Sequence, residues 1–344
     1  MKLLTIAIPT YNRAANLELL LRCLRTEVSA LKNEVTVLVS DNASSDDTPR
    51  VLRDAQRDWA ELTVRRNEQN IGADGNFCEI LDRIDSRYFW VLGDDDLPKT
   101  GVISKLIALL LRESPALVYM QSEWVKPIIG PDQGTQVGEL RFDSFDRADF
   151  AKRVHIWCTF ISGMLVDHQQ LMRGLNGQSV RRFSGTSLVQ LGWVYPVLKS
   201  GSKFLFVRDQ CVLATRDNTG GYGLLTVFGV NFSRVSREAF DDQPDIAKSL
   251  IERGMMRYLP GLIWSSRKPG DQRFDKDNPW PGMRRELGSK AMFWALLVPI
   301  GRLPRIVAMP FYLASRIMNR VAHGFDNLLA RRRRRKFEPV SSDA

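Results

Sequence analysis

The sequence predicts an α/β protein whose mostly parallel, Rossmann-like sheet carries helices on both faces. Short runs rich in β-branched residues alternate with segments of helical periodicity over roughly the first 120 residues, a pattern typical of β-α-β units. Polar or glycine residues follow these runs directly, as at the ligand-binding edge of such a sheet. With 344 residues and 44% hydrophobic content, the chain can also bury a large core.

The first β-α-β unit is predicted from residues 3–8 and 35–40, which form two apolar runs. Between them, large apolar residues recur at helical spacing: Leu17, Leu20, Leu21, Leu24, Val28 and Leu31. The alternation then continues with a helix within 41–55, a strand at 62–66, a helix at 75–85, a strand at 87–92, a helix at 102–111 and a strand at 116–120.

The second part of the chain has a weaker α/β rhythm. A loop rich in proline and glycine covers residues 126–137, and aromatic clusters follow in 154–163 and 190–198. We expect the remaining strands of the sheet and an acceptor-side surface there. Residues 218–280 combine glycine-rich loop with predicted helices.

Cysteine and histidine usage excludes two classes of protein. The four cysteines are widely spaced without a C-x-x-C pair, and the chain has only three histidines. Neither a disulfide framework nor a zinc site is predicted. The N-terminal apolar run of six residues is too short for a secretory signal, so we expect a cytoplasmic location.

The residues after the predicted strands are the first candidates for a ligand site. They are residues 9–13, 41–42, 67–72 and 93–96. Because the carboxyl ends of parallel strands meet at one edge of a sheet, we expect these four segments to lie close together.

Three adjacent acids, Asp94, Asp95 and Asp96, follow the predicted strand at 87–92. Neighbouring carboxylates raise each other's pKa unless a cation lies among them. Mg²⁺ or Mn²⁺ suits oxygen ligands and commonly shares protein carboxylates with substrate phosphates, where it neutralises charge on a leaving diphosphate. The alternative is a solvated acidic turn at the start of the next helix.

Asp41 is the second anchor of the predicted site, because it directly follows a buried-type strand. Its carboxylate could accept hydrogen bonds from a base or a ribose, whereas the alternative is a turn-forming Asp-Asn pair. Residues 9–13 add a rigid bend, an aromatic ring and a cation at the same edge, although Tyr11 could equally be a packing residue.

Four ordered segments resemble the family 2 glycosyltransferases, which are inverting nucleotide-sugar transferases with the glycosyltransferase-A fold. They are LTIAIPTYNRAANL, VTVLVSDNASSDDT, RNEQNIGADGNF and YFWVLGDDDLPKTG, within residues 3–101. Within this family, RNEQNIGADGNF, SGTS at 184–187 and RDN at 216–218 are most similar to bacterial O-antigen sugar transferases of the abequosyltransferase type.

The resemblance implies a role for individual residues of this chain. It places the nucleotide-sugar contacts at Pro9, Thr10, Tyr11, Arg13, Asp41, Asn70, Gly72, Asp94 and Asp95. It makes Asp96 a metal ligand, with Asn218 standing near a position where the family often has histidine. Gly93 occupies the place of the first acid in the family's D-x-D-D pattern.

The catalytic base is the one part of the family pattern that has no match. The family usually supplies an acid about 90 residues after the metal motif, which here falls near Ser187, and no aspartate or glutamate occurs between His168 and Arg208. The candidates are Asp209 and Asp217, ahead of Asp167 and His155. A reaction without an enzymic base is the remaining possibility.

Positive charge is concentrated at the C-terminus. Residues 281–344 hold 13 lysines and arginines against four acids, which is nearly all of the net charge of +10. Two apolar runs, 291–301 and 306–314, are both shorter than the ~18 residues needed to cross a bilayer. We expect this basic amphipathic segment to lie on the inner leaflet, with its cations on anionic head groups. The alternatives are a helical subdomain with a charged tail, or nucleic-acid binding, which we do not expect.

The sequence therefore predicts a metal-dependent hexosyl- or deoxyhexosyltransferase. It would transfer a sugar from a nucleoside diphosphate sugar to a lipid-linked saccharide acceptor, in bacterial surface polysaccharide synthesis. The predicted organisation is a nucleotide-sugar-binding half at 1–125, an acceptor-side half at 126–225, a helical and loop region at 226–288 and the basic segment at 289–344. The alternatives are a metal-dependent nucleotidyltransferase and a catalytically inactive nucleotide-binding protein at the membrane surface.

Overall fold

The computed structural model describes residues 1–126, 136–216, 223–268 and 278–337. The chain divides into two compact units: unit 1 comprises residues 1–220 and 238–243, and unit 2 comprises residues 221–237 and 244–344.

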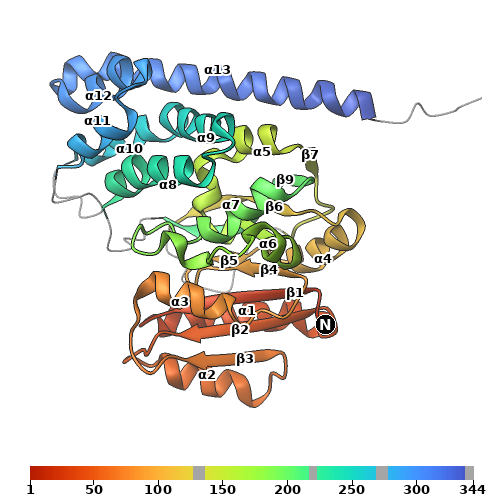
Figure 1. Ribbon diagram of the computed structural model, residues 1–344. Helices are drawn as coiled ribbons and strands as arrows, with labels where there is room; N and C mark the ends of the chain where they lie inside the picture. Colours follow the sequence, from red (N-terminus) through yellow and green to blue (C-terminus); the bar gives the residue numbers. More distant parts are fainter. Residues whose placement is uncertain (127–135, 217–222, 269–277, 338–344) are drawn as a thin grey trace, which may run out of the picture. The chain divides into compact units, whose positions relative to one another are not determined.

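Unit 1 is built around one sheet of nine strands in the order β3-β2-β1-β4-β8-β6-β9-β5, with β7 also paired to β9 (Figure 1). The strands are β1 Leu4–Thr10, β2 Val35–Asp41, β3 Leu62–Arg66, β4 Tyr88–Val91, β5 Leu97–Pro98, β6 Leu117–Val125, β7 Phe142–Phe145, β8 Met164–Asp167 and β9 Phe204–Thr215.

The first four strands confirm the predicted parallel arrangement. β1 lies between β2 and β4 and is parallel to both, and β3 is parallel to β2. In this register Thr10 pairs with Asp41, and Ala7 pairs with Val91. The carboxyl ends of β1, β2, β3 and β4 therefore lie along one edge of the sheet.

The other strands differ from the sequence prediction in two ways. The chain does supply further strands after residue 126, but β8 is antiparallel to both of its neighbours, β4 and β6. The two-residue strand β5, which was not predicted, pairs with β9 immediately after the three acids. Strands this short carry no periodic signal, so only their partners reveal them.

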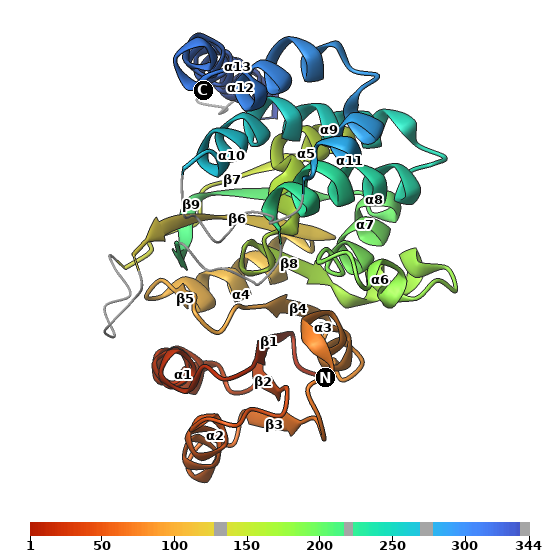
Figure 2. The same ribbon diagram turned by 90° about the vertical axis from the view of Figure 1, so that its left-hand side faces the viewer.

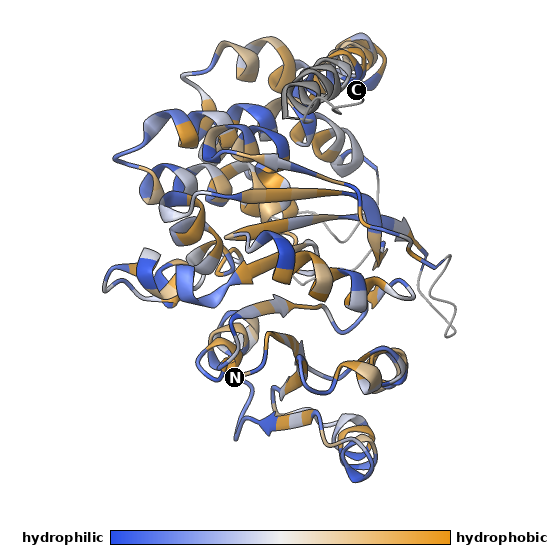
Figure 3. Ribbon diagram, turned by 90° about the vertical axis from the view of Figure 1, so that its right-hand side faces the viewer, coloured by the Kyte–Doolittle hydropathy of each residue, from blue (hydrophilic) through white to orange (hydrophobic). Residues whose placement is uncertain are grey.

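Helices cover both faces of this sheet. They are α1 Ala14–Val28, α2 Thr48–Arg57, α3 Gly72–Leu81, α4 Val102–Glu113, α5 Arg147–Val154, α6 His168–Leu175 and α7 Leu191–Ser200, with four short 3₁₀ turns, Ser29–Leu31, His155–Thr159, Ile161–Gly163 and Val180–Phe183. Figure 2 shows α1 and α2 on one side of the sheet and α3 on the other. Side chains of β1 and β2 form a buried core with α1, α2 and α4, and the strands are mostly hydrophobic in Figure 3.

Unit 2 is helical. Its elements are a π-helical turn Thr226–Asn231, α8 Phe232–Ala239, whose last two residues belong to unit 1, α9 Pro244–Arg257, α10 Leu259–Ser266, α11 Trp280–Leu287, a second π-helical turn Phe293–Leu297, α12 Val298–Arg302 and α13 Arg305–Phe337. A separate apolar core joins them, including Met255, Leu259, Met283, Leu297 and Ile300. Among the described residues, no helix has both the length and the apolar character required to cross a bilayer.

Candidate active site

The three acids lie in a tight turn, Gly93–Asp96, which we call the carboxylate turn. All four residues of β4 are buried, and the turn that follows is closed by a hydrogen bond of 3.2 Å from the Asp96 amide to the Gly93 carbonyl. The chain then enters β5, which is held by β9. The turn is therefore fixed at both ends at the carboxyl edge of the parallel strands.

Each of the three carboxylates has a different protein partner. The Thr10 hydroxyl donates to Asp94 Oδ2 over 2.8 Å. Arg13 Nη1 donates to Asp95 Oδ2 over 2.8 Å and lies 3.6 Å from Asp94 Oδ1. Thr10 is the last residue of β1 and Arg13 follows it by three positions, so the predicted meeting of the first and fourth strand ends is observed.

Asp96 is held by two residues that the sequence did not indicate. The Ser162 hydroxyl donates to its Oδ2 over 2.5 Å, and the Thr215 amide donates to its Oδ1 over 3.0 Å. The Thr215 hydroxyl also donates to the Asp95 carbonyl, over 2.6 Å. Thr215 at the end of β9 and Ser162 in the turn before β8 therefore complete the site from the second half of the sheet.

Burial raises the pKa values of two of these acids. The pKa of Asp94 rises to about 6, mainly because burial disfavours its charge, although Arg13 and the Thr10 hydroxyl oppose the rise. The pKa of Asp96 rises to about 7 through burial and then the neighbouring charge of Asp95, against the bond from Ser162. Three carboxylates face a single guanidinium, so the turn lacks positive charge.

This charge deficit fits a divalent cation. Each oxygen of Asp96 accepts one of these hydrogen bonds, from Ser162 and from Thr215, and a carboxylate oxygen has a second acceptor site. The described residues contain no group of three or more His, Cys, Asp or Glu side chains arranged to hold a metal. An ion here would thus take one or two carboxylates from the protein and its other ligands from phosphate oxygens and water, as Mg²⁺ commonly does.

Gly93 explains why the family's first acid is absent from this turn. A Cβ atom built on Gly93 would lie 3.2 Å from both Asp95 Oδ1 and Asp96 Oδ2, and 3.3 Å from Ser162 Oγ. These distances are tighter than ordinary van der Waals contacts. A side chain at this position would have to displace the groups that hold Asp96.

Asp41 ends β2 and is fully buried. Its Oδ1 accepts a hydrogen bond of 2.9 Å from the Ser44 amide, and its Oδ2 accepts one from Arg66, whose guanidinium also donates to the Ser44 carbonyl over 2.8 Å. Arg66 ends β3 and its side chain is 46% exposed. For Asp41 to contact a nucleotide, the solvent-facing Arg66 would first have to move.

Four asparagines tie the neighbouring strand ends together: Asn42, Asn67 and Asn70, which lie in the predicted segments 41–42 and 67–72, and Asn76, which lies outside them. The Asn42 amide donates to Asn70 Oδ1 over 2.8 Å, while Asn42 Oδ1 accepts from Asn67 over 3.0 Å. Asn67 also donates to Asn76 Oδ1 over 3.1 Å. The predicted N-x-G turn forms, since Asn70 Oδ1 accepts from the Gly72 amide over 2.9 Å and Gly72 has a φ of 78°.

The segment after β1 presents its aromatic ring to solvent. Tyr11 is 43% exposed, so its ring is not enclosed in the core. Asn12 adopts a left-handed conformation with φ 52°, and its Oδ1 accepts from the Ser45 amide over 2.8 Å. A surface pocket is lined by residues that include Asn12 and Arg13, which follow Tyr11 in the sequence. Its other lining residues include Ser45, Asp46 and Asp47.

The structure does not bring Asp209 to the carboxylate turn. Its carboxylate accepts three hydrogen bonds from Arg141, of 2.5, 2.6 and 2.9 Å, and these hold its pKa below the ordinary value despite partial burial. Asp209 also precedes Thr215 by six residues on β9, which is a rise of roughly 20 Å along a strand. Asp217 and Asn218 lie outside the described residues.

Of the other two base candidates, Asp167 lies away from the three acids and His155 is buried. Asp167 pairs with Tyr88 at the start of β4, the opposite end from Gly93, and its Oδ1 caps α6 by accepting from Gln170 over 2.9 Å. His155 is 2% exposed at the junction of α5 and a 3₁₀ turn. The aromatic clusters offered Trp157, Trp193 and Tyr195 for stacking on an acceptor sugar. Trp193 and Tyr195 are core residues at 2% and 1% exposure, whereas Trp157 is partly buried and its ring centroid lies 6.0 Å from that of Trp124.

Asp74, which the sequence analysis did not single out, contacts the loop that contains Ser187. Its Oδ2 accepts a hydrogen bond of 2.7 Å from the Gly185 amide, within the SGTS segment. Burial raises the pKa of Asp74, against opposing backbone bonds from Gly185 and Ser187. Asp74 follows the N-x-G turn by two residues, which was the available signal.

Residues 5–168 match the family model described as Glycosyl transferase family 2. Over 96 residues the chain is 34% identical to abequosyltransferase RfbV of Salmonella typhimurium, covering 27% of this chain and 28% of that protein. Over 105 residues it is 30% identical to GalNAc(5)-diNAcBac-PP-undecaprenol beta-1,3-glucosyltransferase of Campylobacter jejuni, covering 30% and 33%. The matches thus span about a third of the length of these relatives.

Solved structures with the same fold extend over nearly the whole chain. S. aureus TarS 1–349 in complex with UDP-GlcNAc has a TM-score of 0.60 at 15% identity, covering 94% of this chain and 92% of that one. Mannosyltransferase PcManGT from Pyrobaculum calidifontis, in complex with GDP-Man and Mn²⁺, has a TM-score of 0.52 at 14% identity, covering 92% and 86%. These likenesses confirm the predicted glycosyltransferase-A fold.

Proposed function

Residues 5–168 form a glycosyl transferase family 2 domain, and from this premise we propose that the chain transfers a sugar from a nucleoside diphosphate sugar to a saccharide acceptor with the help of Mg²⁺ or Mn²⁺. The observation that carries the proposal is the carboxylate turn, where the buried acids Asp94 and Asp96 have raised pKa values and where, among the described residues, Arg13 pairs with Asp94 and Asp95. A bound cation would supply the missing charge and neutralise the leaving diphosphate.

The donor would occupy the carboxyl edge of β1, β2 and β4. Asp96 and Asn218 would hold the cation, and Asp94 and Asp95 would face the donor sugar or ribose. The residues that would line the nucleotide are Pro9, Thr10, Tyr11, Arg13, Asp41, Asn70 and Gly72. Of these, Arg13 has the clearest electrostatic role: burial disfavours its charge, yet Asp94 and Asp95 raise its pKa overall. It remains cationic and can bind either the carboxylates or a diphosphate.

The acceptor hydroxyl must lose a proton as it attacks the anomeric carbon. We propose Asp217 for this step ahead of Asp209, because Asp217 follows Thr215 by only two residues and Thr215 contacts both Asp95 and Asp96. Asp209 is engaged by Arg141.

The finer part of the proposal concerns the pathway. The name of the Campylobacter jejuni relative contains a PP-undecaprenol-linked saccharide, which supports an acceptor of the lipid-linked saccharide type for this chain. The reaction would belong to bacterial surface polysaccharide synthesis. Such an acceptor is held at a membrane, which supports a peripheral position on the inner face of the cell membrane. The transferred unit would be a hexosyl or deoxyhexosyl group.

Thermal unfolding with UDP, GDP, CDP and dTDP, each with and without Mn²⁺, tests the proposal. A ligand that binds only the folded state stabilises it by about 2.7 kcal/mol at 100 times its dissociation constant. We expect one nucleotide to raise the melting temperature in a Mn²⁺-dependent way, and Asp96→Asn to abolish this response. Asp85→Asn, which changes an exposed acid of the same unit, is the matched control. No response to any nucleotide would reject the proposal.

A further inference from the structure

Helix α13 has one side packed into unit 2 and one side exposed. Ala308 and Ser315 are 0% and 2% exposed, and Phe311 and Tyr312 pack against the core of unit 2. Tyr312 stacks on Trp264 with ring centroids 4.7 Å apart. The helix is therefore anchored without using its outer side.

The outer side carries large apolar residues. Ile306, Leu313, Ile317 and Val321 are 88%, 52%, 62% and 57% exposed, and we call them the outer row. Their spacing of seven, four and four residues aligns them along one side of the helix. A contiguous exposed apolar surface of this kind marks an interaction site.

The charges beside the outer row have one sign. Arg305, Arg316 and Arg320 are exposed on α13, and residues 305–325 contain no aspartate or glutamate. Farther along the same helix the sequence continues into Arg331–Lys336. Like charges would oppose the pairing of two copies through this face, whereas an anionic lipid surface attracts it.

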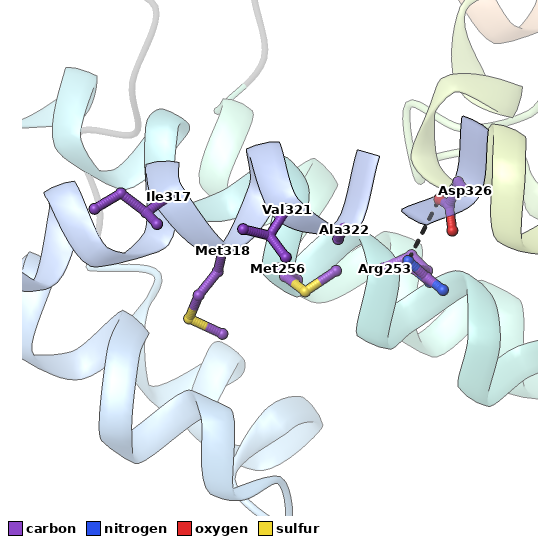
Figure 4. A pocket seen from close by; sticks show the side chains of 7 residues that line it. All are labelled: Arg253, Met256, Ile317, Met318, Val321, Ala322 and Asp326. Carbon is purple, nitrogen blue, oxygen red and sulfur yellow. Dashed lines mark ion pairs between the residues drawn. The ribbon is translucent and has the colours of Figure 1, made fainter. Parts of the chain in front are cut away.

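An apolar pocket adjoins the outer row between α9 and α13 (Figure 4). Its volume is about 490 Å³, and Ile317 and Val321 of the outer row help to line it together with Met256 and Met318. Asp326 lies at one end of the pocket, 3.6 Å from Arg253 and also in contact with Arg257. The only acid in the pocket is thus paired with two arginines, and the apolar lining is open to an acyl chain.

We propose that the outer row of α13 inserts at the boundary between head groups and acyl chains of an anionic membrane, with Arg305, Arg316 and Arg320 on the head groups. This deepens the membrane part of the proposed function by assigning it to one face. Its readout does not require sugar transfer, so the two can fail separately.

Sedimentation of the full-length protein with vesicles tests this assignment. The vesicles contain phosphatidylglycerol with phosphatidylethanolamine, or phosphatidylcholine alone. The test variant is Leu313→Glu/Ile317→Glu. Its matched control is Leu111→Glu/Met172→Glu, which makes the same charge change at side chains that are 63% and 60% exposed on α4 and α6.

We expect the wild type and the control to bind the anionic vesicles, and the outer-row variant to bind about a hundredfold more weakly. All three should have the same far-UV circular dichroism spectrum and the same urea unfolding midpoint without ligand, which shows that the outer-row variant is folded. The inference is overturned if the outer-row variant binds vesicles as tightly as the wild type, or if the wild type does not bind them. It is also overturned if the wild type is a dimer in solution, the outer-row variant is a monomer, and the two bind vesicles equally well.

A fluorescent label gives a second, independent measurement. The four native cysteines are at most 5% exposed, so an environment-sensitive dye attached through Ile317→Cys should react selectively. We expect its emission to shift to the blue with anionic vesicles. A label on Leu111→Cys should not shift, and equal shifts at both positions would contradict insertion through the outer row.

Discussion

The carboxylate turn and the outer row of α13 are opposite departures from the usual distribution of polar and apolar groups. In the turn, Asp94 and Asp96 are charged groups that are 8% and 6% exposed. In the outer row, four large apolar side chains are all more than half exposed. Buried charge and exposed apolar surface both cost free energy in water. Each departure therefore indicates a partner: a cation with its nucleotide for the turn, and a lipid surface for the row.

The largest effect should come from neutralising the turn. Asp96→Asn keeps an oxygen for the Thr215 amide and an amide for the Ser162 hydroxyl, but removes the charge that would hold the cation. We expect transfer to fall by roughly 10³-fold, or about 4 kcal/mol of transition-state stabilisation. Steady-state assays with the chosen donor measure it, with Asp85→Asn as control. Transfer retained in Asp96→Asn would remove the turn from the mechanism.

The loss of the catalytic base should differ from the loss of the carboxylate turn in its effects on kcat and on donor binding. We expect Asp217→Asn to lower kcat by roughly a hundredfold or more while donor binding stays intact, because general bases contribute 10²- to 10⁴-fold. Asp209→Asn should have little effect on kcat, since its carboxylate serves Arg141. Nucleotide titration by calorimetry reports binding separately. The opposite ranking of the two variants would reassign the base to Asp209.

A third expectation concerns the dependence of stability on pH without ligand. The folded-state pKa values of Asp94 and Asp96 are raised to about 6 and about 7 from 3.8. The folded state thus binds more protons than the unfolded state between pH 4 and 7, and stability falls as pH rises through this window. We expect a loss on the order of a few kcal/mol by pH 8, measured by urea unfolding. Asp96→Asn should weaken this dependence, and an unchanged slope would contradict the burial of that charge.

The smallest effect should come from placing a charge on the outer row. Ile317→Glu adds a carboxylate at a side chain that is already 62% exposed, so the free energy of unfolding should change by less than about 0.5 kcal/mol in water. The contrast is Leu297→Glu, which charges a side chain at 0% exposure in the core of unit 2 and should unfold that unit. A large loss in Ile317→Glu would show that the row is packed.

The first half of the sheet could be predicted because its signals are local. Apolar runs and helical periodicity lie within single elements, and the predicted strand at 62–66 coincides with β3. The prediction stopped at 120 for a strand that continues to Val125 as β6, since the polar residues at its end break the apolar run. β5 and the antiparallel β8 depend on pairing with distant segments, which periodicity does not encode.

The site divides in the same way. Thr10, Arg13 and the three acids follow strands directly, so parallel topology alone brought them together. Ser162 and Thr215 are 66 and 119 residues away from Asp96, and neither carries a motif that marks it as a partner. No acid was found in the sequence near Ser187, and the acid that contacts this loop, Asp74, comes from α3, more than a hundred residues earlier in the chain.

The short strand β5 also affects whether a strand of another chain can pair with the edge of the sheet. One rim of the sheet is β3, which ends in Arg65 and Arg66, and the other is shared by β5 and β7, of two and four residues. Pro98 in β5 has no amide hydrogen to offer. Charged, very short and proline-bearing edges are features that prevent strand addition. The sheet is thus protected on both rims against edge-to-edge aggregation, which favours storage and crystallisation at high concentration.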